Sequence, residues 1–166
     1  MKKEDYLELL DARLARYFDK KQLTAELPFT IIAEMNAADE GYFFLPSIKT
    51  YSVQHNEYLY AHSFAHKVQK EDLLPYLNYM KEKMQQLKTT TEHMSSVFAL
   101  LIICENGMDE ATLAEMQKYK YHKDYFLSLK GWSDLAIYVA DLQQEKLYCN
   151  KIGRKTSQCF EFVPSK

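Results

Sequence analysis

The run from Ser95 to Cys104, SSVFALLIIC, constrains the fold more than any other part of this sequence. It contains no charged residue, so neither face of a strand built from it can meet water without cost. Such a strand is typical of the centre of a sheet that is covered on both faces. Its apolar part, Val97 to Cys104, is far shorter than the ~20 residues that span a bilayer. The run therefore predicts a layered domain in which Leu101 and Ile102 are both buried.

Hydrophobic periodicity predicts three helices around this strand. Residues 4–19 carry an apolar stripe with the spacing of an amphipathic helix. The clearest helix covers 71–88, with Pro75 in its first turn, where a missing N–H costs little. Its apolar residues recur at helical spacing and should face the core: Leu73, Leu77, Met80, Met84 and Leu87. Asp109 is placed to cap a third helix over 109–120.

Strand patterns account for most of the remaining chain. FTIIAEM at 29–35 and YFFLPSI at 42–48 flank a turn signal and predict a hairpin. Pro46 makes the second of these an edge strand or ends it early. Further strands are predicted at 57–66, 124–130, 134–141 and 146–150. The order α-β-β-β-α-β-α-β-β predicts an α+β fold, with one mostly antiparallel sheet of about five to seven strands packed with about three helices.

Length and composition predict a single α+β domain over residues 1–166. The three cysteines, Cys104, Cys149 and Cys159, form no CxxC pair. We therefore expect free thiols in a reducing compartment, with no disulfide framework and no structural metal. The N-terminal sequence MKKEDYLELLDARL has acidic residues where a signal peptide needs an apolar core. We accordingly expect a cytoplasmic protein.

Known catalytic motifs are missing from the sequence. It contains no GxGxxG, GxxxxGK[ST] or GxSxG pattern, which gives no support to dinucleotide, P-loop or α/β-hydrolase sites. The order α-β-β-β-α-β is also the core order of restriction-endonuclease-like nucleases, which need a D/E-x-K triplet on a strand beside another acidic residue. The match to this triplet, Asp19-Lys20-Lys21, falls at the end of a predicted helix. Element order alone does not carry a function.

Two other groups of reactive residues have structural explanations. His62 and His66 would be neighbours on a helix, but four residues of a strand separate them by ~13 Å, too far for one metal ion. Cys104 ends the most buried strand, and His122 and Asp124 are potential partners that would activate its thiolate. Nothing in the spacing requires the three to meet, and a buried structural cysteine is the default interpretation. We expect no catalytic residue among these groups.

The C-terminal third holds the best candidate for a functional surface. Residues 1–116 carry a net charge of −6, whereas residues 117–166 carry +4. Gly131 and Gly153 bracket a predicted hairpin, and the basic residues after 145 should gather near one end of it. The candidate ligand-binding residues are Trp132, Asp134, Lys146, Lys151, Arg154 and Lys155. The alternative is that this is a solvated hairpin, with Trp132 in the core.

The motifs G131-W132-x-D134, D141-L142 and N150-x-x-G153-R154 carry a family resemblance. Over about residues 93–155 the chain resembles an uncharacterised bacterial and archaeal family of unknown function. This resemblance implies a small cytoplasmic domain and carries no activity with it.

These observations favour a non-enzymatic binding or interaction module. The chain has 13 tyrosines, which suit half-buried strand faces and contact surfaces, and its charge is polarised between its two parts. The alternative is nucleic-acid or phosphate-ligand binding through the C-terminal basic hairpin, on a degenerate nuclease-like scaffold. An enzyme that uses Cys104 or a carboxylate is a third class. The sequence leaves open both binding to a protein partner and formation of a homodimer. We expect neither a cofactor nor membrane association.

Overall fold

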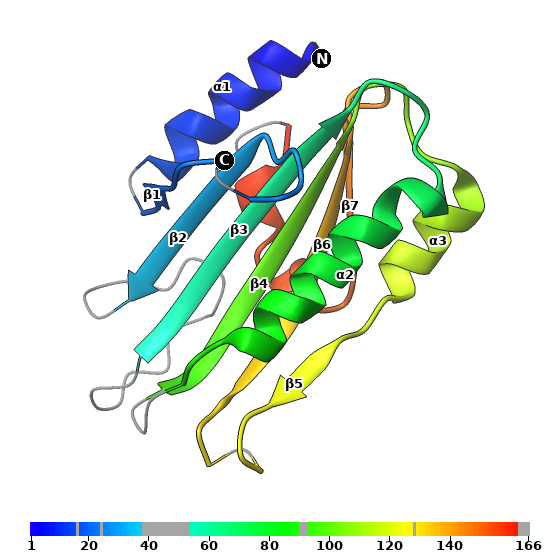
Figure 1. Cartoon of the computed structure of the whole chain (residues 1–166). Coiled ribbons are helices and arrows are strands. Elements are labelled where there is room, and N and C mark those ends of the chain that lie inside the picture. Colours follow the sequence, from blue (N-terminus) through cyan, green and yellow to red (C-terminus); the bar gives the residue numbers. More distant parts are fainter. Residues whose placement is uncertain (16, 24, 38–53, 90–92, 128, 163–166) are drawn as a thin grey trace.

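The computed structural model describes residues 1–166 except 16, 24, 38–53, 90–92, 128 and 163–166. Within the described residues, seven strands form one sheet in the order β1-β2-β3-β4-β6-β5, and β7 also pairs with β6 (Figure 1). The strands are β1 (Asp19–Lys20), β2 (Ile31–Ala37), β3 (Gln54–Phe64), β4 (His93–Cys104), β5 (His122–Asp124), β6 (Trp132–Asp141) and β7 (Lys146–Cys149). Four of the six pairings are antiparallel, but β3–β4 and β4–β6 are parallel. The expected sheet is thus confirmed in outline, with a parallel centre.

Helices cover both faces of this sheet (Figure 1). The helical elements are α1 (Lys3–Leu14), α2 (Lys70–Gln86), α3 (Glu110–Lys118) and the 3-10 turns η1 (Gly153–Lys155) and η2 (Ser157–Phe160). α2 and α3 pack on one face, whereas α1 and η2 pack on the other. No helix among the described residues is long and apolar enough to cross a membrane.

The central strand β4 separates two hydrophobic cores. Leu101 is fully buried and packs in the core that contains Leu10 of α1 and Phe160 of η2. Its neighbour Ile102 is also buried and packs in the core that contains Met80 of α2. Successive residues of a strand point to opposite faces, so an entirely apolar run is buried only when both faces are covered. The predicted burial on both faces is therefore confirmed.

Helix α2 follows its predicted face closely. Its predicted apolar residues are buried or, for Leu87 just after the helix, partly buried: Leu73, Leu77, Met80, Met84 and Leu87. Gln69 and Asp72 form a reciprocal capping box at its N-terminus, which satisfies backbone groups that the first turn leaves open. Two details differ from the prediction. Pro75 lies inside α2 rather than in its first turn, because the helix begins at Lys70. Lys83, outside the apolar face, is half-buried above the ring of Tyr79.

The first helix is shorter than its periodicity predicts. α1 ends at Leu14 rather than at residue 19, and Asp19–Lys20 instead pair with β2 as a short edge strand. Phe18 is buried in the core, whereas Tyr17, which would continue the helical stripe, is 40% exposed. Strand pairing with β2 therefore overrides a weak local helix preference, as tertiary contacts commonly do.

Two strand predictions have different outcomes. The second strand of the expected N-terminal hairpin, 42–48, lies outside the described residues. The predicted strand 124–130 is wrong, because β5 ends at Asp124 and a turn follows it. Phe126 and Leu127 in that turn have φ values of 51° and 53°, which no β-strand contains.

Asp109 caps α3 as expected, accepting a hydrogen bond from the backbone N–H of Thr112.

Candidate functional site

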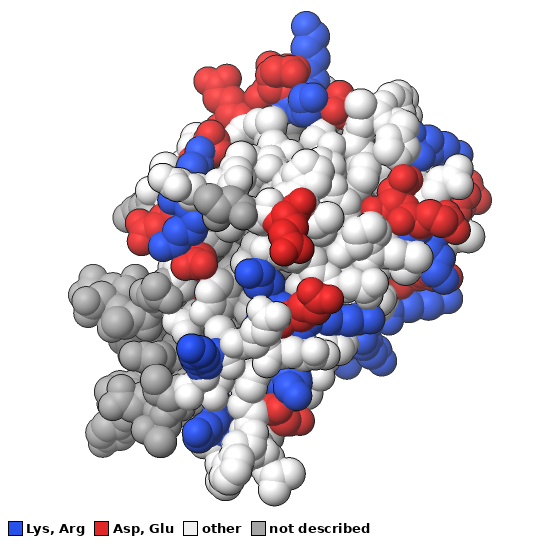
Figure 2. Space-filling model, viewed as in Figure 1, with Lys and Arg blue, Asp and Glu red and all other residues white. Residues whose placement is uncertain are grey.

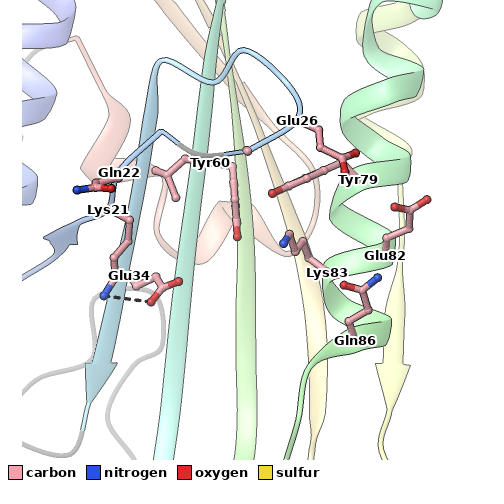
Figure 3. A pocket seen from close by; sticks show the side chains of 11 residues that line it. Lys21, Gln22, Glu26, Glu34, Tyr60, Tyr79, Glu82, Lys83 and Gln86 are labelled. Carbon is pink, nitrogen blue, oxygen red and sulfur yellow. Dashed lines mark ion pairs between the residues drawn. The ribbon is translucent and has the colours of Figure 1, made fainter.

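A cavity of about 380 Å³ opens at one edge of the sheet, between strands β2 and β3 and helix α2 (Figure 3). The segment that follows β1 closes its remaining side. The lining residues are Lys21, Gln22, Ala25, Glu26, Ile32, Glu34, Tyr60, Tyr79, Glu82, Lys83 and Gln86. Cavities of this size accommodate small organic ligands.

Regular secondary structure positions most of this lining. Ile32 and Glu34 are two residues apart on β2, so they share a face, and Tyr60 of β3 lies directly opposite Ile32. On α2, Tyr79 lies three and four residues before Glu82 and Lys83, so these side chains follow one side of the helix. Positions fixed by a ladder and by a helix are better defined than positions on a loop.

Aromatic rings form the floor of the cavity. The buried ring of Phe29 lies 5.2 Å from the rings of both Tyr60 and Tyr79 and 5.4 Å from that of Tyr76. The rings of Tyr60 and Tyr79 themselves meet edge to face at 5.7 Å. Aromatic pairs at these separations add stability beyond the area they bury, so the floor is held in one arrangement. Of these rings, those of Tyr60 and Tyr79 line the cavity.

The charges around this floor are mixed but favour the negative sign. Lys21 contacts the carboxylate of Glu34 at 3.4 Å on one wall (Figure 3). Lys83 lies 5.2 Å from the centre of the Tyr79 ring. Three glutamates therefore share the lining with two lysines, because Glu26 and Glu82 add to Glu34. Burial, with the neighbouring Tyr79 and Glu34, raises the pKa of Tyr60 well above its usual value, so its hydroxyl stays neutral.

The residues predicted as a C-terminal site lie in separate places. Trp132 and Asp134 lie at the start of β6, where Asp134 bonds the ring of His122 at 2.7 Å. Lys146 pairs with Asp141 at the opposite end of β6, roughly 30 Å from Trp132 at the usual rise of a strand. Its amine lies 4.9 Å from the Tyr148 ring. A single small ligand therefore cannot contact both Trp132 and Lys146.

The three remaining basic residues of that prediction stay together. Lys151, Arg154 and Lys155 are all exposed, on and just before η1. Gly153 between them is buried, and a Cβ atom there would come within 2.9 Å of the Tyr138 ring. This glycine permits close packing of η1 on β6, rather than supplying a turn that only glycine can adopt. The basic part of the predicted surface thus reduces to one short exposed segment.

Cys104 does not meet its potential activating partners. Cys104 pairs with Asp141 on β6, whereas His122 pairs with Asp134, seven residues and roughly 23 Å along the same strand. Burial, together with nearby Asp141, raises the pKa of the Cys104 thiol to about 12. A thiol with such a pKa is not a nucleophile at neutral pH. All three cysteines are free, as expected.

The histidines of the considered metal site are engaged in packing and ion pairing. The ring of His62 stacks on that of Tyr76 at 4.8 Å, and His66 contacts the carboxylate of Asp72 at 3.0 Å. Burial lowers the pKa of His62, which therefore favours its neutral form. In the part of the chain that the structure describes, no three metal-ligating side chains gather.

The Asp19-Lys20-Lys21 triplet lies on and beside a strand, which corrects its expected place on a helix. Asp19 is in register with Glu34 on β2, and Lys21 contacts Glu34. Lys20 in turn pairs with Asp11 of α1 at 2.7 Å. Both lysines are therefore engaged with carboxylates at an exposed edge, away from the parallel centre of the sheet.

A family model matches residues 2–162, and its description is a domain of unknown function, DUF8052. The chain belongs to this family. The DUF8052 match covers nearly the whole chain, and it confirms the resemblance to a family of unknown function that was inferred over 93–155. No curated protein and no solved structure matches the chain.

No sequence motif of this DUF8052 chain predicted the edge cavity. Its walls come from separate segments, which are residues 21–26, 32–34, 60 and 79–86. One sequence signal could have indicated the aromatic floor. Two pairs of closely spaced tyrosines occur there, Tyr58 and Tyr60 in β3 and Tyr76 and Tyr79 in α2. The register that brings Tyr60 beside Tyr79 is a property of the folded chain.

Proposed function

We propose that the protein is a non-enzymatic binding module whose ligand site is the edge cavity. The ligand class that this cavity favours is a small organic molecule with a positively charged nitrogen beside a planar or apolar body. The observation that carries the proposal is the tyrosine floor of Tyr60 and Tyr79 beneath three glutamates and two lysines. Ring faces attract cations, and the surplus carboxylate supplies a counter-charge.

The present contacts of the cavity support this ligand class. Lys83 already places its amine over the Tyr79 ring, which is the contact that a ligand cation would make. Glu34 is partly neutralised by Lys21, whereas no ion pair is described for Glu26 or Glu82 within the described residues. A cationic ligand would therefore approach Glu26 and Glu82 and compete with Lys83 for the ring.

Benzylamine and benzoate provide a matched pair of probes, because they share one ring and differ in charge. Benzylamine at ten times its Kd should raise the Tm by about 3–6 °C, whereas benzoate should leave it unchanged. The double variant Glu26→Gln/Glu82→Gln should lose the response to benzylamine. Glu8→Gln, which removes an exposed carboxylate of α1, is the control and should keep it. Equal responses to the two probes, or none, would contradict the proposal.

A second candidate is the binding of nucleic acid or another polyanion by Lys151, Arg154 and Lys155. The observation that favours it is that all three side chains are exposed within five positions. Arginine offers a bidentate fork to phosphate, and about three neutralised phosphates give a log–log salt slope of roughly −2 to −3. Polyanion binding at low salt, lost in the Lys151→Ala/Arg154→Ala/Lys155→Ala variant, would favour this function. Binding that is absent, or equal in both proteins, would reject it.

A further inference from the structure

The turn between β5 and β6 exposes a cluster of large apolar side chains. Phe126 is 71% exposed, Leu127 91% and Leu129 73%. The other exposed large hydrophobic residues of the described chain are far from this turn in the sequence and stand singly there: Met1, Tyr17, Leu23 and Leu74. In Figure 1 this turn projects at the lower end of the sheet, and in Figure 2 the same place is an uncharged lobe with both basic and acidic atoms beside it. Scattered apolar residues are ordinary on protein surfaces, but a contiguous apolar cluster indicates an interaction site.

The conformation of this turn is costly for the residues it contains. Phe126 and Leu127 both adopt left-handed backbone angles, which glycine or asparagine would adopt at lower cost. The sequence therefore places two bulky apolar residues where neither burial nor backbone preference favours them. Strained residues that persist in a fold concentrate at functional positions.

The base of the turn is firmly anchored. Tyr125 is buried, and its hydroxyl donates to the carbonyl of Met84 at 2.6 Å and lies 2.7 Å from Ser133 Oγ. The backbone N–H of Tyr125 donates to the carbonyl of Gly131, and that of Lys130 donates to the carbonyl of Tyr125. The apolar tip is thus presented on a closed loop, so little conformational entropy is lost when it binds.

Two lysines adjoin the apolar cluster. Lys130 places its amine 5.8 Å from the centre of the Phe126 ring, and Lys123 of β5 is half-exposed. The acidic residue nearest in sequence, Asp124, contacts His122 at 3.3 Å. Two lysines and a partly compensated carboxylate therefore neighbour three exposed apolar side chains. Apolar side chains beside cations match a lipid surface, where acyl chains lie next to anionic phosphates.

We propose that the β5–β6 turn docks on an anionic lipid surface, inserting Phe126, Leu127 and Leu129 among the acyl chains while Lys123 and Lys130 contact lipid phosphates. The convex shape of the turn favours this partner over a second protein. Three residues at the tip of a hairpin bury much less than the ~800 Å² per partner of a stable protein complex. Insertion at a surface needs no such area, and each lysine near an anionic leaflet adds attraction. The proposal departs from the expectation of no membrane association, and it concerns attachment rather than spanning.

Vesicle binding tests this proposal with a variant chosen to keep the fold. Phe126→Asn/Leu127→Asn removes two apolar side chains and supplies residues that tolerate left-handed angles. The control is Leu74→Gln, which removes an exposed leucine from α2. Wild type and control should sediment with vesicles of phosphatidylcholine and phosphatidylglycerol, and the double variant should bind roughly tenfold or more weakly for each side chain that no longer inserts. Lys123→Gln/Lys130→Gln should lose the preference for anionic over neutral vesicles.

Trp132 gives a second readout that needs no label. It is the one tryptophan of the sequence and follows directly after Gly131 at the base of the turn, so its emission should shift to the blue when wild type binds vesicles. Wild type that binds no vesicle, or a double variant that binds as well as wild type, would overturn the proposal. So would a concentration-dependent dimer that the double variant abolishes in the absence of vesicle binding, because the tip would then bind a second copy of the chain.

Discussion

Gly153→Ala should destabilise the protein although it adds a single methyl group. The new Cβ would lie 2.9 Å and 3.1 Å from two atoms of the Tyr138 ring and 3.1 Å from the Cβ of Cys149. The ring cannot easily yield, because Tyr138 is fully buried, meets the Phe160 ring at 4.4 Å and bonds Thr156 through its hydroxyl at 2.6 Å. The contact is therefore tighter than a packed core accepts without movement.

The expected loss of unfolding free energy is about 1–3 kcal/mol, as for other additions to a filled core. Alanine offsets about 0.4–1 kcal/mol of this by restricting the unfolded chain, so a net loss of about 1–2 kcal/mol remains. In a domain of this size such a loss lowers the Tm by about 2–8 °C. Urea unfolding followed by circular dichroism measures it directly, with an unchanged m-value as the sign that the unfolded state is the same.

A double-mutant cycle decides whether the ring causes this loss. Tyr138→Leu removes the ring, so adding Gly153→Ala to that variant should cost less than it costs in the wild type. The two changes should therefore couple by about 1 kcal/mol, as expected for residues in direct contact. Equal costs in both backgrounds, or a stabilising effect of Gly153→Ala, would refute the assignment of Gly153 to close packing.

Three further measurements test the packing and titration assignments. Leu101→Ala should lower the free energy of unfolding by about 2–5 kcal/mol, and a loss below about 1 kcal/mol would contradict burial of β4 on both faces. Leu77→Asp should abolish soluble expression, because Leu77 is 5% exposed and the change buries a carboxylate, whereas Leu74→Asp on the same helix, at 44% exposure, should be tolerated; equal tolerance would show a wrong helix face. His62 has a lowered pKa in the fold, so the unfolded chain binds more protons, and stability should fall as the pH drops below about 6.5. His62→Phe should flatten this acid limb, and an unchanged limb would assign it to other groups. The pKa of His122 is raised, chiefly by its hydrogen bond to Asp134. The stabilising contribution of His122 should therefore be fully present below about pH 6.5 and should be lost as the pH rises through its folded-state pKa.

The elements that sequence patterns predicted well are those with strong local signals. β4 contains an unbroken apolar run, and α2 carries a regular apolar stripe, so both were placed within two or three residues. Elements with weak signals were misplaced. The stripe of α1 extends past Leu14, but Phe18 reaches the core only because the chain leaves the helix there. The segment after Asp124 is rich in apolar residues and was predicted as a strand, yet its backbone turns.

The candidate sites show the same division. That the C-terminal segment is basic could be read from residue types, and Lys151, Arg154 and Lys155 do lie together on the surface. The antiparallel pairing of β6 with β7 places Lys146 at the opposite end of β6 from Trp132. Residue spacing in the sequence does not reveal this pairing. The edge cavity depends on the pairing of β2 with β3 and on the packing of α2 against both.

From the sequence alone one could predict a sheet with a buried central strand, a helix that packs through one face, and membership of a family of unknown function. The first two follow from the order of apolar and polar residues over short stretches, because apolar side chains avoid water. The parallel arrangement of the three longest strands, the meeting of tyrosines of β3 and α2 around a cavity, and the exposure of Phe126 and Leu127 on a turn are visible only in the folded chain. These features depend on contacts between residues far apart in the chain, and such contacts are set by the packing of the whole domain rather than by any local pattern.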